Sequence, residues 1–184
     1  MTGLHRFLRG IHKRYFRPDR LAELRREGLV VGESFHMLGE VLIDSSHCWH
    51  ITIGDYVTLA PRVMILAHDA STKMHLGYSR IGKVSIGNHV FIGASSIILP
   101  GVTVGNDVVI GAGSVVCHDI PDGVVAAGNP AKTLRTIDDF LSRRRSEMKS
   151  CPCFGKEYTL GGNVTDEMKN EMNKAMNNRF GYVV

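Results

Sequence analysis

Aliphatic residues recur at every sixth position through the middle of the chain, and glycine usually follows them. The regular part of this pattern comprises Ile86, Ile92, Ile98, Val104, Ile110 and Val116. An earlier run in the same style holds Ile53-Gly54, Leu59-Ala60 and Ile65-Leu66. A period of six fits neither a helix of 3.6 residues per turn nor the long strands of an open sheet. It predicts a parallel β-helix in which each hexapeptide forms one short strand and a turn.

The expected core follows from this pattern, because one aliphatic side chain per repeat points inward and stacks on its equivalents in the neighbouring coils. Three repeats make a triangular coil of about eighteen residues. We expect glycine after the aliphatic residue because the chain bends there and glycine accepts a positive φ at little cost. The β-helix is expected over residues 29–135, with a register slip at 45–50 and a polar excursion loop at about 69–85. Loops that leave a rigid scaffold often carry functional sites.

Helical appendages are expected on both sides of the β-helix. Residues 1–28 form an N-terminal arm in which Leu4, Phe7 and Ile11 share a helical face, and Pro18 begins a second short helix that ends at Gly28. The basic arm packs on the β-helix or on a neighbouring subunit, or alternatively rests on an anionic membrane surface.

Residues 136–184 form the C-terminal extension, with a charged helix from about Ile137 to Lys149. Cys151-Pro152-Cys153 interrupts it, and we expect Thr165 to cap a final helix with a stripe of methionines on one face. Residues 126–132 are expected to form a turn that leaves the last coil. The predicted fold class is therefore all-β, with helical appendages.

Composition narrows the class of protein. The 184 residues suit one domain with appendages, and no apolar run is long enough to cross a membrane. The N-terminus lacks the apolar core of a secretory signal, and four cysteines do not resemble a disulfide framework. We therefore expect a cytoplasmic protein, or one peripheral to the inner face of the membrane through its basic arm. The net charge of +4 suits an anionic small molecule better than nucleic acid.

Several motifs, in order along residues 51–135, resemble those of the hexapeptide-repeat acyltransferases. They include Ile-Thr-Ile-Gly-Asp (51–55), Ala-His-Asp (67–69), Ser-Ile-Gly-Asn-His-Val-Phe-Ile-Gly-Ala (85–94), Val-Ile-Gly-Ala-Gly-Ser-Val-Val (109–116) and Ala-Gly-Asn-Pro-Ala-Lys (127–132). The branch they resemble contains the galactoside, maltose, nodulation-factor and polysaccharide O-acetyltransferases. The resemblance implies a left-handed β-helix, a homotrimer with sites between subunits, acetyl-CoA as co-substrate, a sugar or glycan acceptor and no metal.

The resemblance places the catalytic histidine at His68, at the mouth of the excursion. Acetyl transfer to an alcohol needs a base for the hydroxyl proton, and imidazole titrates near neutral pH. A base of this kind works better when an acceptor holds its other nitrogen and so fixes the tautomer. Asp44 and Asp69 are the two candidates for that acceptor, and the resemblance favours Asp44.

Other residues are assigned to the co-substrate and the acceptor through the same resemblance. The N–H of Ala94 matches the oxyanion donor, while Ala112 and Gly113 are small enough for a pantetheine arm to lie against the backbone. The remaining assignments are Lys132 and Arg135 at the nucleotide end of coenzyme A; Cys117 and His118, where many relatives have Thr-Lys; Phe91 beside the acceptor; and Lys73, Tyr78 and Arg80 in the excursion. The departure at 118 removes one expected cation.

Three alternatives stay open at this point. A zinc enzyme of the γ-class carbonic anhydrase type needs three histidines, two of them usually spaced H-x4-H, and His47 and His50 are spaced differently. A non-catalytic scaffold would use the flat β-helix faces to bind a partner. An N-acetyltransferase would act on an amine of a nucleotide sugar, and no residue separates that activity from O-acetylation.

Overall fold

The computed structural model describes residues 20–184, and the chain divides into two compact units at Ile137/Asp138. The described part of the first begins with α2 (Arg20–Arg26), which ends just before Gly28, where the sequence predicts the end of a helix. The amphipathic helix expected at the start of the arm, with its membrane contact, lies outside the described residues.

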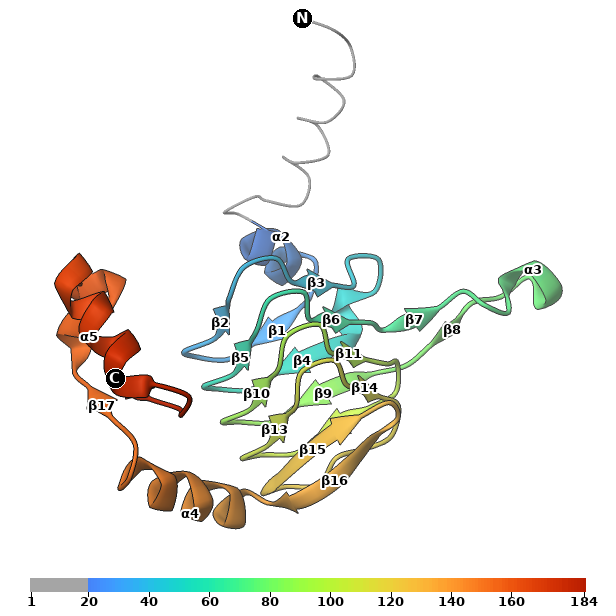
Figure 1. Ribbon diagram of the computed structural model, residues 1–184. Coiled ribbons are helices and arrows are strands. Elements are labelled where there is room, and N and C mark those ends of the chain that lie inside the picture. Colours follow the sequence, from blue (N-terminus) through green and yellow to red (C-terminus); the bar gives the residue numbers. More distant parts are fainter. Residues whose placement is uncertain (1–19) are drawn as a thin grey trace, which may run out of the picture. The chain divides into compact units, whose positions relative to one another are not determined.

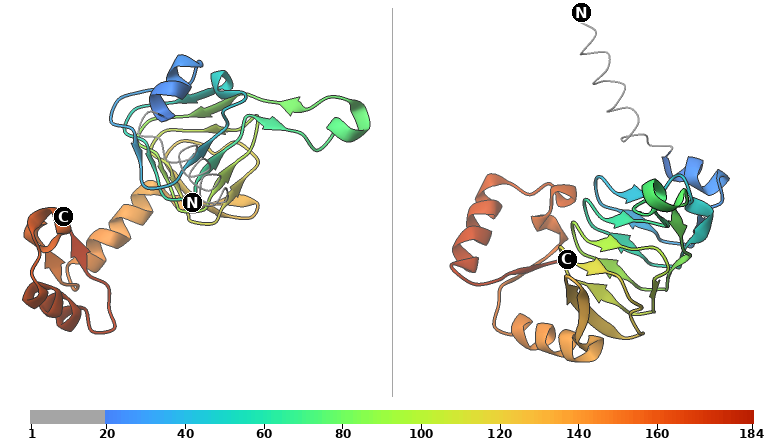
Figure 2. Two further views of the ribbon diagram at one scale, coloured as in Figure 1. Left: turned by 90° about the horizontal axis from the view of Figure 1, so that it is seen from above. Right: turned by 90° about the vertical axis from the view of Figure 1, so that its right-hand side faces the viewer.

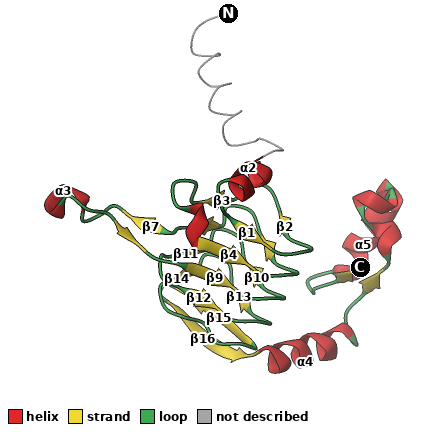
Figure 3. Ribbon diagram, turned by 180° about the vertical axis from the view of Figure 1, so that it is seen from behind, coloured by secondary structure: helices red, strands yellow, loops and turns green. Residues whose placement is uncertain are grey.

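The first unit is built from short parallel strands stacked in three sheets (Figures 1 and 3). The first sheet has the order β1-β4-β9-β12, the second β16-β15-β13-β10-β5-β2 and the third β14-β11-β6-β3. Successive strands visit the three sheets in turn, so three strands complete one coil. Their bounds are β1 (Val30–Val31), β2 (His36–Met37), β3 (Leu42–Ile43), β4 (Ile51–Ile53), β5 (Thr58–Leu59), β6 (Met64–Ile65), β9 (Val84–Ile86), β10 (Phe91–Ile92), β11 (Ile97–Ile98), β12 (Thr103–Val104), β13 (Val109–Ile110) and β14 (Val115–Val116).

The six-residue pattern is confirmed by strand register and by burial. Phe91 pairs with Val109, and Ile97 with Val115, so equivalent positions in successive coils lie eighteen residues apart. The aliphatic residue of each regular repeat is buried, and together these side chains form one core: Ile86, Ile92, Ile98, Val104, Ile110 and Val116. Burial of this apolar column stabilises the coils, since each strand has only two or three residues to pair.

Glycine follows the aliphatic residue for a different reason from the one expected. The glycines at 54, 87, 93, 105 and 111 do not have positive φ; instead Tyr56, His89 and Asp107 adopt the left-handed conformation. A Cβ on Gly87 would lie 2.7 Å from the carbonyl oxygen of Gly105 in the next coil. The glycine is therefore required by the close approach of stacked backbones rather than by a left-handed bend.

Two insertions interrupt the regular coils on the same side of the stack. The slip at 45–50 contains a 3-10 turn, η1 (Cys48–His50). The expected excursion is an arm in which β7 (His68–Asp69) pairs antiparallel with β8 (Arg80–Ile81), and its tip carries α3 (Lys73–Leu76). Figures 1 and 2 show the arm standing out from the coils.

The coils end in a hairpin rather than in the simple turn expected at 126–132. β15 (Val124–Gly128) continues the second sheet parallel to β13, and β16 (Ala131–Thr136) returns antiparallel to β15. β16 is therefore an antiparallel strand at the edge of the second sheet.

The second unit follows the hairpin. It consists of α4 (Ile137–Met148), β17 (Cys153–Phe154), η2 (Lys156–Tyr158), η3 (Leu160–Gly162), α5 (Asp166–Met176) and β18 (Tyr182–Val183). Thr165 caps α5 as predicted, because its hydroxyl accepts a hydrogen bond of 3.3 Å from the N–H of Met168. Within residues 20–184, no helix has the length and apolar character needed to cross a membrane.

Shortening one side chain of the core column should cost a measurable part of the stability. Ile98 is fully buried, so Ile98→Val is expected to lower the free energy of unfolding by about 0.5–1.5 kcal/mol. Ile81 is 53% exposed in the arm, and Ile81→Val should change it by less than about 0.5 kcal/mol. Urea unfolding of both variants tests this, and equal effects would contradict the proposed core.

Candidate active site

The candidate site lies where segments leave the strands of the third sheet. Asp44 directly follows β3, and His68 begins the arm three residues after β6, the strand that pairs with β3. Parallel neighbours end at the same edge of a sheet, so the two residues come together although 24 positions separate them. We call this side of the third sheet its carboxyl edge, and the side where its strands begin its amino edge.

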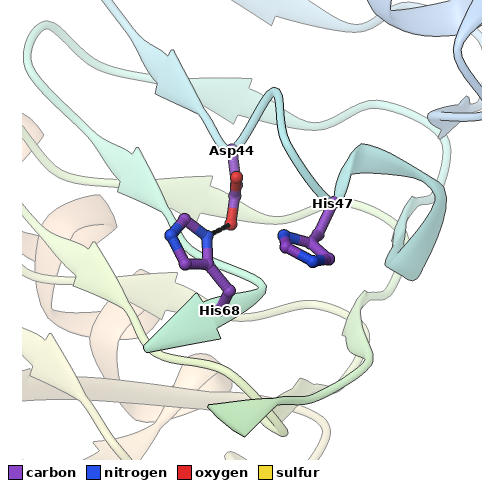
Figure 4. A group of neighbouring side chains, drawn as sticks. All are labelled: Asp44, His47 and His68. Carbon is purple, nitrogen blue, oxygen red and sulfur yellow. Dashed lines mark hydrogen bonds and ion pairs between the residues drawn. The ribbon is translucent and has the colours of Figure 1, made fainter. Parts of the chain in front are cut away.

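The carboxylate of Asp44 contacts the imidazole of His68 at Nδ1 (Figure 4). Its side chain is 3% exposed; Oδ2 contacts His68 Nδ1 and accepts a 3.0 Å hydrogen bond from the N–H of Ala67. Oδ1 accepts from Ser46, at 3.0 Å from N–H and 2.8 Å from Oγ. Burial acts to raise the pKa of Asp44, but the hydrogen bonds from His68, Ser46 and Ala67 outweigh it and lower the pKa below its usual value. The carboxylate is therefore charged at neutral pH.

The contact with Asp44 determines which nitrogen of the His68 ring carries the proton. A carboxylate at Nδ1 favours the tautomer with its proton on that nitrogen, which leaves a lone pair on Nε2. The side chain is 33% exposed, so the ring is held at Nδ1 and is partly accessible from outside. This arrangement is what a general base needs.

Asp69, the other carboxylate considered from the sequence, is arranged differently. Its Oδ1 accepts a 2.8 Å hydrogen bond from the N–H of Ser71, and this bond lowers the pKa of Asp69. The carboxylate thus closes a turn at the start of the arm. Of the two candidates, Asp44 is the one that the structure brings to the imidazole.

Sequence reasoning did not place Ser46 or His47 beside this pair, although it weighed His47 as a possible zinc ligand. Ser46 Oγ lies 3.3 Å from His68 Nδ1 and 3.2 Å from His47 Nδ1. The His47 and His68 rings are 5.0 Å apart between centroids. Figure 4 shows the His47 ring directed toward the Asp44–His68 pair. The sequence feature that pointed to both residues was the register slip at 45–50, because the inserted residues bring polar side chains back to the carboxyl edge of the third sheet.

The small residues assigned to the co-substrate lie at the opposite edge of the third sheet. Ala94 precedes β11, while Ala112 and Gly113 precede β14, so all three lie at the amino edge. The carbonyl of Ala94 accepts a 2.8 Å hydrogen bond from the N–H of Gly113. The structure therefore brings these three residues together, but a whole sheet separates them from His68 in the same chain.

The remaining assigned residues are spread over the first unit. Cys117 and His118 follow β14 at the carboxyl edge, with Sγ and Nδ1 3.2 Å apart. Phe91 is 41% exposed on the second sheet, and Lys132 and Arg135 lie in β16 of the hairpin. Lys73, Tyr78 and Arg80 are exposed along the arm, whose tip stands away from the chain's own coils (Figure 2). One chain thus does not gather these residues around His68.

Comparison with known proteins gives the family of this chain. The family described as "Bacterial transferase hexapeptide (six repeats)" matches residues 83–118. Protein CapG of Staphylococcus aureus is 37% identical over 163 residues, which cover 86% of this chain and 90% of that protein. The galactoside O-acetyltransferase of Escherichia coli (strain K12) is 45% identical over 92 residues, 48% of this chain and 45% of that enzyme.

A solved structure agrees with these relatives. The crystal structure of a maltose O-acetyltransferase from Clostridium difficile 630 is 34% identical, with a TM-score of 0.51 over 64% of this chain and 74% of that chain. The chain belongs to the hexapeptide-repeat transferase family, and the resemblance stated from its sequence is confirmed. Membership implies the left-handed sense of the coils, and the protein is a transferase.

Proposed function

We propose that this protein moves the acetyl group of acetyl-CoA to a hydroxyl of a sugar or polysaccharide precursor, with His68 as general base. The observation that carries the proposal is the buried carboxylate of Asp44 on Nδ1 of a partly exposed imidazole. The similarity to a galactoside and a maltose O-acetyltransferase supports the choice of acetyl donor and of acceptor class.

The proposed reaction uses the two nitrogens of His68 in different ways. Nε2 takes the proton of the acceptor hydroxyl while the oxygen of that hydroxyl attacks the thioester carbonyl. The tetrahedral intermediate then breaks its carbon–sulfur bond, and the imidazolium returns the proton to the leaving thiolate. The charged Asp44 stabilises the imidazolium between these steps. Base assistance of this kind is worth about 10²–10⁴-fold in rate.

The positions of the assigned residues support a site shared by two subunits. His68 lies at the carboxyl edge of the third sheet, whereas Ala94 and Gly113 lie at its amino edge. These edges meet only if the carboxyl edge of one β-helix faces the amino edge of another. Three prisms packed around an axis satisfy this requirement three times, so we propose a homotrimer in which the N–H of Ala94 is the oxyanion donor to a neighbour's reaction.

The proposed segments then have distinct roles. The β-helix of residues 29–135 carries the chemistry, with Phe91 and the arm residues Lys73, Tyr78 and Arg80 reaching an acceptor at a subunit boundary. No step of this reaction is assigned to the N-terminal arm of residues 1–28 or to the extension of 136–184. We propose that the protein works on the cytoplasmic side, where acetyl-CoA is available.

Thiol release from acetyl-CoA, followed across a panel of sugars and amino sugars, tests the proposed function. Acceptor-dependent release is expected with at least one hydroxyl sugar, and identification of the product ester separates O- from N-acetylation. Release only with amino sugars would favour the N-acetyltransferase alternative. No release with any acceptor or glycan fragment would favour a scaffold.

Lys132 is proposed to contact the anionic end of coenzyme A from the terminal hairpin. Lys132→Ala is expected to raise the KM for acetyl-CoA more than the KM for the acceptor, because it removes a cation near the phosphates. Lys149→Ala in the second unit removes the same charge elsewhere and serves as the control. Steady-state kinetics with each substrate varied measures both constants, and an unchanged KM for acetyl-CoA would reject the contact.

A further inference from the structure

The carboxyl edge of the third sheet holds three potential metal ligands, and two of them are the proposed catalytic pair. Asp44, His47 and His68 each offer one donor atom, and the three atoms lie within 4.8 Å of one another. Figure 4 shows the three side chains converging from two neighbouring turns of the chain. We propose that this cluster binds a divalent transition-metal cation of the Zn²⁺ class, and that the bound cation reversibly inhibits the enzyme.

The chemistry of the donors selects the kind of cation. Two imidazoles and one carboxylate suit zinc, cobalt, nickel or copper, whereas Mg²⁺ and Ca²⁺ prefer sites made of oxygen ligands. Three protein ligands leave a fourth position of a tetrahedral site open to water or a small anion. The partial exposure of the His68 side chain gives a cation access from outside.

The donors are also held in place by groups around them. Ser46 binds Oδ1 of Asp44 and lies 3.2 Å from Nδ1 of His47, so it links two of the three ligands. Outer hydrogen bonds of this kind orient ligands and strengthen metal binding. Metal–ligand distances of about 2.0–2.2 Å place tetrahedral donor atoms roughly 3.4 Å apart. Where Nδ1 of His68 is the ligand, binding replaces the direct Asp44–His68 hydrogen bond by two bonds to the cation and draws His47 inward.

Cys48 does not complete the site, although it follows His47 directly. Its sulfur lies within hydrogen-bond distance of the carbonyl oxygens of Leu24 and Glu27, on the side of α2, and the residue is fully buried. The cluster is thus a set of two histidines and one aspartate rather than a thiolate site. This set lies on the same atoms that the proposed reaction uses.

Inhibition follows from either way in which His68 binds the cation, and this part of the inference rests on the proposed function. Coordination through Nε2 occupies the lone pair that takes the acceptor proton. Coordination through Nδ1 removes the Asp44 contact that fixes the tautomer and stabilises the imidazolium. His47 takes no part in the proposed reaction, so its loss should weaken the metal site without removing the base.

The experiment compares the wild-type protein with three histidine variants after removal of metal by a chelator. His47→Ala removes a ligand, and His47→Gln retains more of the side-chain volume. His89→Ala is the matched control: His89 is an exposed histidine 3.7 Å from the carboxylate of Asp107, and that pair is not part of a three-ligand group among residues 20–184. Zn²⁺ binding is measured by titration calorimetry, and Co²⁺ binding by visible absorption. Contributions from the cysteines are common to all the proteins.

Binding of one cation per chain is expected in the wild type and in His89→Ala, with the dissociation constant at least about 10-fold higher in both His47 variants. The same variants should retain acetyl transfer and lose sensitivity to Zn²⁺ by a similar factor. Equal binding by wild type and both His47 variants, or no stoichiometric binding by wild type, would overturn the site. Binding at His47 without inhibition of an active enzyme would overturn the inhibitory role. If no acceptor supports transfer, the proposed function fails and the binding data alone decide the metal site.

Discussion

Replacing His68 with alanine is expected to lower turnover by at least about 10²-fold, because the acceptor hydroxyl loses its proposed base. An alkoxide does not form from a sugar hydroxyl near neutral pH without such help. The His68 side chain is two-thirds buried, so the substitution also removes one hydrogen-bond partner of the Asp44 carboxylate. We expect kcat to carry the loss while the KM for acetyl-CoA changes little. Steady-state thiol release, at saturating donor and acceptor, measures it.

The control for this substitution is a more exposed histidine that also lies near a carboxylate and has no proposed role. His89→Ala removes an exposed imidazole that stacks on Tyr56 and lies near Asp107. It should leave turnover within a few-fold of wild type. Both variants should keep the circular dichroism spectrum and oligomeric state of the parent. Near-normal turnover in a well-folded His68→Ala protein would remove His68 from the role of base.

The coils were predictable from the sequence because one physical requirement repeats. Each strand is too short to be held by pairing alone, so every repeat must contribute a buried aliphatic residue, and Ile86 to Val116 show that requirement directly. The role of glycine was not predictable in the same way. Gly87 is needed because Gly105 of the next coil approaches it closely, and that distance depends on the stacking of coils rather than on the local bend.

The hairpin at the end of the coils escaped the sequence pattern for a related reason. Strands β15 and β16 are longer than the others and lie antiparallel to each other, so the six-residue period no longer marks them. The Asn129–Pro130 segment between them has the composition of a simple turn. The pairing of Val125 with Arg135 on either side of it is a tertiary fact that composition does not report.

The candidate site was predictable only in part. The motif around His68 suggested the imidazole as a candidate base, but the choice between Asp44 and Asp69 depends on which carboxylate the stacked coils bring into contact with the ring. Register of the third sheet decides it, since Leu42 pairs with Met64 and so sets Asp44 beside the start of the arm. Ser46 and His47 belong to the inserted residues, where the repeat offers no alignment. Their contacts with Asp44 and His68 form only when the inserted residues fold into a turn.

The separation of the assigned residues was likewise hidden in the linear sequence. His68 and Ala94 are 26 positions apart and belong to successive coils, which suggests proximity. The sheet order shows that His68 follows a strand of the third sheet and that Ala94 precedes one. The width of that sheet therefore separates the two residues. A site that used both residues would therefore need two chains, as the proposed homotrimer provides.

Asp44→Asn is expected to lower turnover by about 10²-fold, although it barely changes the shape of the side chain. Both oxygens of Asp44 accept hydrogen bonds from backbone donors, one from Ala67 and one from Ser46. An amide must direct its NH₂ group at one of these N–H donors, and burial of an unsatisfied pair costs about 1–3 kcal/mol. If the NH₂ group faces His68, the ring must accept at Nδ1 and carry its proton on Nε2, which is the wrong tautomer for a base. The charge that stabilises the imidazolium is lost in either orientation.

The measurements for Asp44→Asn separate an effect on the base from a general loss of structure. A fall in kcat with little change in the KM for acetyl-CoA, together with a changed protonation pattern of the His68 nitrogens in NMR spectra, is the expected result. Asp69→Asn is the matched control, since that carboxylate closes a turn with Ser71, and its turnover should stay within a few-fold of wild type. A larger loss in Asp69→Asn than in Asp44→Asn would assign the orienting carboxylate to the arm instead. Equal, small losses in both would show that the His68 imidazole works without a fixed partner.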